Sequence, residues 1–163
     1  MDRIALEILT VEMRQDAAVI ADSARLARAR LGEPHEGHLE ACGFELQRLY
    51  NVLEKAFERV CTAFENHFDK QADYHERLIQ RMVLEIPGVR PAFLPHAAQD
   101  GVRELKAFRH VFRHAYEMRL RQDRLSELVS LAENVAGAFP AWAGDFVARI
   151  KAGLPPSPTP ANE

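Results

Sequence analysis

Two arginines, two histidines and a tyrosine lie within one short segment, Phe108 to Tyr116, which reads FRHVFRHAY. An imidazole can accept or donate a proton near neutral pH, and a guanidinium stays charged and pairs with phosphate oxygens. Four residues separate Arg109 from His114, but the same spacing recurs over residues 30–35, so this pair alone is weak evidence. Only His114 is followed two places later by a tyrosine, Tyr116. The combination therefore predicts a site that binds a phosphate and moves a proton.

A helix predicted from about Gln99 to Arg121 must position these side chains. Its apolar residues cluster on one side and are expected to face the core: Leu105, Phe108, Phe112 and Ala115. Arg109 and Tyr116 lie along the flank of this stripe, whereas His114 points about 140° away from its centre. We therefore expect His114 to face solvent or a second subunit.

The remaining chain shows helical periodicity and no strand pattern. Helices are predicted over about 2–31, 38–67 and 73–86, with a last one from Asp123 that Pro140 kinks or splits. Asp73 and Glu76 have the spacing of a capping box at the start of the third helix. Pro87 and Gly88 should end that helix, and the proline-rich stretch to Pro95 should be irregular. The fold class is therefore all-α, a helical bundle of about five helices over residues 1–152, followed by a disordered proline-rich tail over 153–163.

The composition is that of one soluble globular domain. The chain has 163 residues, of which 47% are hydrophobic and 28% charged. Its net charge is −3, yet residues 103–124 carry seven basic and three acidic side chains. One basic element on an acidic body fits either a solvated helix face or an anion-binding surface.

The two cysteines and the chain start favour a cytoplasmic location. Cys42 and Cys61 fall on one predicted helix about 28 Å apart, too far for a disulfide, so both are expected to be reduced core thiols. The N-terminus lacks the pattern of a signal peptide, and no apolar run is long enough to span a membrane.

Three kinds of chemistry can be weighed against these residues. Catalysis by a serine or cysteine nucleophile lacks its motifs, and no glycine-rich phosphate loop is present. His110, His114 and Glu117 share a helix face that could bind a metal, but the Glu-x-x-His motif of di-metal bundles does not occur. Metal-free cleavage of a phosphodiester remains, and RNA suits it because its own 2′-hydroxyl is the nucleophile. Because Arg109 and His114 diverge on a regular helix, either the helix is distorted or two copies combine in a symmetric dimer, which we prefer.

The segment Arg109 to Tyr116 resembles the Arg-x4-His-x-Tyr signature of the HEPN superfamily, specifically its HepT-like toxins. Residues 74–78 (YHERL) and 84–91 (LEIPGVRP) also look like segments of that branch, and the resemblance extends from about Tyr50 to Tyr116. It implies a helical, homodimeric endoribonuclease that needs no metal or other cofactor.

The resemblance also implies site residues and a partner. Arg109 and His114 would be the catalytic pair, His110 and Arg113 accessory groups, and RNA the substrate. In that family a minimal nucleotidyltransferase antitoxin adenylylates the motif tyrosine, which here is Tyr116. The family also includes non-catalytic members, so a helical nucleotide-binding or scaffold module is the alternative. The division of roles between His110 and His114 stays open.

Overall fold

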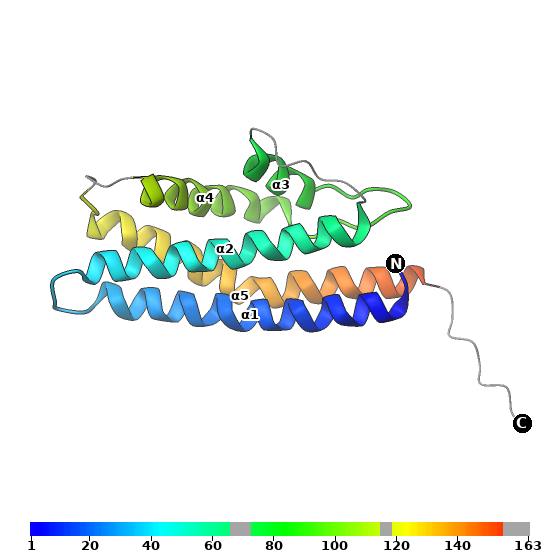
Figure 1. Ribbon diagram of the computed structural model, residues 1–163, viewed down its shortest axis with the longest axis horizontal. Helices are drawn as coiled ribbons and strands as arrows, with labels where there is room; N and C mark the ends of the chain where they lie inside the picture. The colour runs from blue at the N-terminus through cyan, green and yellow to red at the C-terminus, as the bar shows by residue number, and fades with distance from the viewer. Residues whose placement is uncertain (66–72, 115–118, 155–163) are drawn as a thin grey trace, which may run out of the picture.

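The computed structural model describes residues 1–65, 73–114 and 119–154. Within these residues it has five α-helices and one short 3₁₀ helix: α1 (Arg3–Leu31), α2 (His38–Phe64), α3 (Tyr74–Met82), η1 (His96–Ala98), α4 (Gln99–His114) and α5 (Gln122–Gly153). The long helices α1, α2 and α5 run lengthwise side by side, and α3 and α4 cover α2 (Figure 1). The predicted all-α bundle of about five helices is confirmed.

The core is apolar and continuous across the helices. The clear stripe on α2 is fully buried at Leu46, Leu49, Leu53 and Phe57, as its spacing of threes and fours predicts. Cys42 and Cys61 are buried free thiols, and burial raises the pKa of both to about 11. They are therefore core residues and not nucleophiles at neutral pH.

Three predicted helix boundaries differ from the structure. The third helix ends at Met82, because its carbonyl accepts hydrogen bonds from the backbone N–H groups of Phe93 and Leu94, both at 2.9 Å. The basic helix is described as far as His114, and residues 119–121 are not helical, so it does not reach Arg121 as predicted. Helix α5 runs continuously through Pro140 and is not split.

The predicted capping box is also wrong. Asp73 has the left-handed φ of 63° and its side chain makes no capping hydrogen bond. The carboxylate of Glu76 instead accepts hydrogen bonds from Arg103 and Lys106 on α4. The hydrogen bond from Lys106 is the largest cause of the lowered pKa of Glu76. This residue therefore ties α3 to α4.

Arg90 holds the irregular segment between α3 and α4. Its side chain is fully buried and donates to the carboxylate of Glu65 and to the carbonyls of Arg81, Leu84 and Pro91. Every guanidinium nitrogen is satisfied, which is the condition for burying such a charge. Residues 86 and 90 form an isolated β-bridge, and no named strand occurs in the described ranges. Arg90 is thus a structural arginine.

The part of the chain that the structure describes contains no helix that is both long and apolar enough to cross a bilayer.

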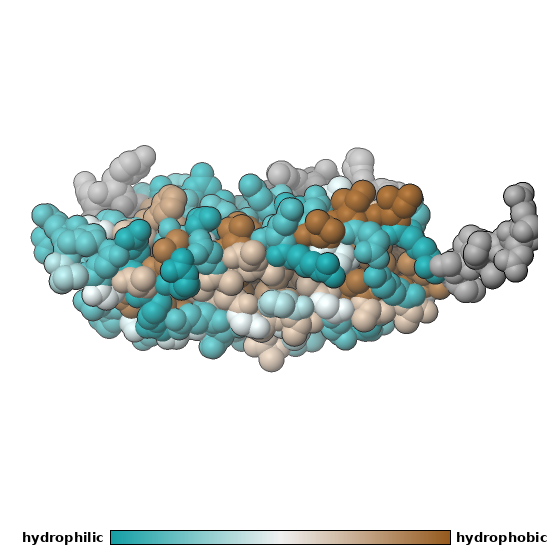
Figure 2. Space-filling model, turned by 90° about the horizontal axis from the view of Figure 1, so that it is seen from below, coloured by the Kyte–Doolittle hydropathy of each residue, from teal (hydrophilic) through white to brown (hydrophobic). Residues whose placement is uncertain are grey.

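The face formed below α1 is largely hydrophilic, with apolar side chains gathered toward the end where α1 begins (Figure 2). Ile4, Ile8 and Val11 on this part of α1 are 75%, 59% and 50% exposed. That end lies opposite the C-terminal end of α4 (Figure 1). The apolar surface and the Arg-His motif are therefore separate features.

Gly43 allows α4 to approach α2 closely. A Cβ atom placed on Gly43 would lie 2.5 Å from Cε2 of Phe112, whose ring stacks on Phe108 at a centroid distance of 5.4 Å. A side chain here would therefore push away the turn of α4 that carries the motif.

We expect Gly43→Ala to destabilise the protein relative to Gly137→Ala, a matched change in the exposed part of α5, where a Cβ meets nothing within 4 Å. Both changes gain the helix propensity of alanine, but only Gly43→Ala crowds the packed ring of Phe112. This overpacking should lower the free energy of unfolding by about 1–3 kcal/mol. Urea denaturation measures the difference. Equal stability of the two variants would show that Phe112 moves aside without cost.

Candidate functional site

The motif divides between two sides of the last turns of α4. The side chain of Arg109 faces α2 and is 13% exposed, whereas His110 and His114 point away from it and are exposed. Arg113, one turn after Arg109 on its side of the helix, is also exposed. Arg109 and His114 are five residues apart on a regular helix, so the predicted divergence follows from the helical repeat. The expectation that His114 lies outside the core is confirmed, and Arg109 and His114 of one chain do not converge.

Three groups on α2 hold Arg109. Its Nε donates to Oδ1 of Asn51 at 2.7 Å, and Nη2 lies 3.8 Å from Oε1 of Glu54. The guanidinium carbon also lies 5.9 Å from the ring centroid of Tyr50, within cation–π range. The arginine is therefore fixed in direction before any ligand binds, which reduces the entropy lost on binding a phosphate.

Glu54 also binds a histidine that the motif does not contain. Its Oε2 lies 2.5 Å from Nδ1 of His75 at the start of α3. The neighbouring Tyr74 hydroxyl donates to Glu58, and burial followed by this contact raises the pKa of Tyr74. Two carboxylates of α2 therefore anchor the first turn of α3.

His114 makes one local contact. Its Nδ1 lies 2.7 Å from the carbonyl oxygen of His110, and the two imidazole rings are 4.7 Å apart. A carbonyl oxygen only accepts hydrogen bonds, so Nδ1 is the donor, and Nε2 has no partner among the residues that the structure describes. The backbone carbonyl of His110 thus orients the His114 ring, and the His110 ring lies beside it.

A small cavity of about 250 Å³ lies on the His114 side of α4. Ala107 and Val111 form part of its apolar wall, and they share a helix face with His114 because they lie seven and three residues before it. Arginines at 119, 121 and 124 also line it. Arg121 and Arg124 pair with acidic residues, whereas Arg119 has no partner among the described residues. An apolar wall beside cationic groups suits a flat ring attached to a phosphate.

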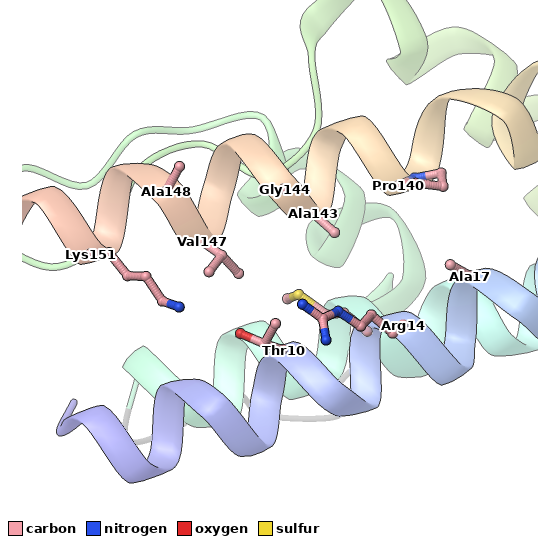
Figure 3. Close-up of a pocket in the computed structure, with 10 residues that line it drawn as sticks. Thr10, Arg14, Ala17, Pro140, Ala143, Gly144, Val147, Ala148 and Lys151 are labelled. Carbon is pink, nitrogen blue, oxygen red and sulfur yellow. The ribbon is translucent and has the colours of Figure 1, made fainter.

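Another cavity lies far from this motif. It has a volume of about 470 Å³ between α1 and α5, where Thr10, Arg14, Val147 and Lys151 are among its lining residues (Figure 3). Helix α4 contributes nothing to it, and its lining holds no imidazole or carboxylate. We therefore do not assign proton transfer to this cavity.

Several predicted site features fall outside the described residues. Tyr116, the predicted acceptor of AMP, and Glu117, the third residue of the alternative metal site, both do so. In the described ranges no three His, Cys, Asp or Glu side chains gather as a metal site would require. The sequence reasoning missed His75, Glu54 and Asn51 as site residues, although His75 lies in the YHERL segment that supported the resemblance.

Fold and motif together define a helical module with an arginine and a histidine on the same helix end. A family model of HepT-like proteins matches residues 41–150, which include most of α2, all of α3 and α4, and most of α5. The chain belongs to this family, and so to the HEPN superfamily. Comparisons with curated proteins and with solved structures gave no match.

Proposed function

We propose that this protein is a toxin ribonuclease of the HEPN type, which cleaves RNA without a metal ion and with the 2′-hydroxyl as nucleophile. The observation that carries the proposal is the pairing of a fixed Arg109 with an exposed His114 at the end of α4 in a HepT-like chain. Arg109 stabilises charge on the phosphate oxygens, and the free Nε2 of His114 transfers a proton. His110 and Arg113 are accessory groups.

Purified protein should cleave RNA in the presence of EDTA and leave 2′,3′-cyclic phosphate ends. His114→Ala and Arg109→Ala should each lower the rate at least about a hundredfold, the usual effect of removing a proton-transfer group or a charge stabiliser. Gel analysis of labelled RNA measures the rate. Controls are His96→Ala and Arg14→Ala, which remove exposed side chains of the same types elsewhere. A wild-type protein inert on every RNA tested, or unaffected rates in both site variants, would contradict the proposal.

The active unit is a homodimer in this proposal. Arg109 and His114 diverge on α4, so a phosphate meets both only where the helix ends of two copies approach each other. His114, His110 and Val111 are exposed on that helix end, which leaves a surface for a second copy.

Mixing the two inactive variants tests this arrangement. In an equimolar mixture of Arg109→Ala and His114→Ala subunits, half of the dimers are mixed, and each has one intact shared site, so about one quarter of the wild-type activity should return. Light scattering at micromolar concentration reports the dimer itself. An active monomer, or no recovery of activity in a mixture shown to exchange subunits, would contradict a shared site.

Regulation is expected at Tyr116. In the proposal a nucleotidyltransferase antitoxin attaches AMP to its hydroxyl, which adds a phosphate beside Arg113, three residues earlier on the chain. That phosphate would compete for the guanidinium groups that bind RNA.

Tyr116→Phe should retain ribonuclease activity and resist the partner, because only the acceptor oxygen is lost. Intact-mass measurement after incubation with the partner, ATP and magnesium detects AMP, and wild-type protein is the matched control. AMP on Tyr50 or Tyr74, or silencing that persists in the variant, would favour steric blocking by the partner instead.

One observation favours a second candidate, a non-catalytic nucleotide-binding or scaffold module of the same fold. Arg109 is mostly buried and already contacts Asn51 and Glu54, as a purely structural arginine would. This candidate predicts that RNA is bound but stays intact, and that the variants change binding alone.

A further inference from the structure

Glu54 joins an arginine and an imidazole of the same chain. Its Oε1 lies 3.8 Å from Nη2 of Arg109, and its Oε2 lies 2.5 Å from Nδ1 of His75. The Glu54 side chain is only 11% exposed, so its position is set by packing on α2. His75 and Arg109 are thus neighbours across one carboxylate, although they lie on α3 and α4.

His75 has one occupied and one free nitrogen. A carboxylate at Nδ1 fixes this nitrogen as the donor and leaves Nε2 without a partner among the described residues. The side chain of His75 is 42% exposed, so a ligand can reach it. An imidazole held by a carboxylate in this way is oriented for proton transfer.

Two other carboxylates near His75 already accept hydrogen bonds. Glu58 accepts the hydroxyl of Tyr74, and Glu76 accepts hydrogen bonds from Arg103 and Lys106. Glu54 itself faces Arg109 on its other oxygen. An anion that approaches His75 and Arg109 therefore meets an imidazole and a guanidinium, whose shared carboxylate, Glu54, already contacts both.

Arg109 is able to bind such an anion. Its Nε and Nη2 contact Asn51 and Glu54, while Nη1 has no partner in the part of the chain that the structure describes. Arg113 lies one helical turn further on the same side of α4 and is exposed. A phosphodiester lying along this side would meet two guanidinium groups and the imidazole of His75.

From this geometry we infer that His75, held by Glu54, is a further proton-transfer residue of the site and acts on the phosphodiester bound by Arg109 of its own chain. The inference rests on the ribonuclease function proposed above. Glu54 is the positioning residue, because its two oxygens contact Arg109 and His75.

Cleavage of RNA through its 2′-hydroxyl requires two proton transfers that balance. The 2′-oxygen loses its proton as it bonds to phosphorus, and the 5′-oxygen gains one as its bond to phosphorus breaks. No oxidant, reductant or other reactant is consumed. His75 carries out one of these two transfers, and His114 is then available for the other.

His75→Asn tests the inference, because the asparagine amide can still donate to Glu54 but has no group at the position of Nε2. We expect at least about a hundredfold loss of rate on RNA, with an unchanged melting temperature. His96→Asn, the same change at an exposed histidine outside the site, should retain the wild-type rate. Glu54→Gln should lower the rate less than His75→Asn, because it removes only the orienting charge.

An RNA whose scissile 5′-oxygen is replaced by sulfur identifies the step, because a thiolate leaves without being protonated. Recovery of His75→Asn on this substrate assigns His75 to protonation of the leaving group, and equal loss on both substrates assigns it to the 2′-hydroxyl. A wild-type rate of His75→Asn on ordinary RNA would overturn the inference while leaving the ribonuclease proposal intact. A wild-type protein inert on RNA would overturn both.

Discussion

The carboxylate of Glu54 is the contact on which the arrangement of the site depends. It lies on α2 and contacts one group from α3 and one from α4, so one side chain links functional groups of three helices. A nearly buried carboxylate needs compensating partners, since removing water from a charge costs several kcal/mol. His75 and Arg109 supply them, and in return each is fixed in orientation. The stability of this region and the geometry of its functional groups therefore have the same physical origin.

Much of the fold could be predicted from the sequence because its helices are long and strongly periodic. The burial of Leu49 and Phe57 follows from spacing alone, as does the exposure of His114. The end of α3 could not be found this way, because Met82 stops the helix through hydrogen bonds to residues 93 and 94. At Pro140 the predicted split does not occur, because α5 is one continuous helix through this residue.

The sequence predicted the site residues that lie on one helix, and it missed the contacts that form between helices. Arg109 and His114 lie on one helix, so their spacing on the chain gives their angular separation directly. Glu54 and His75 are 21 residues apart, and their contact exists only because α3 folds back onto α2. Glu76 shows the same limit, because its sequence position suits a helix cap but its partners lie on α4. Neither contact leaves a periodic signal in the sequence.

The separation of Arg109 from His114 also bears on why such a site would be shared between two chains. One α-helix cannot direct residues five apart at the same atom without distortion, and α4 stays helical through His114. Each chain instead builds a half that is ordered by its own packing, with Arg109 fixed on α2 and His114 oriented by the carbonyl of His110. In the proposed dimer, association of two such halves would bring the groups together without bending either helix. In this arrangement a lone chain would be stable yet incomplete, so association would control activity through geometry and not through folding.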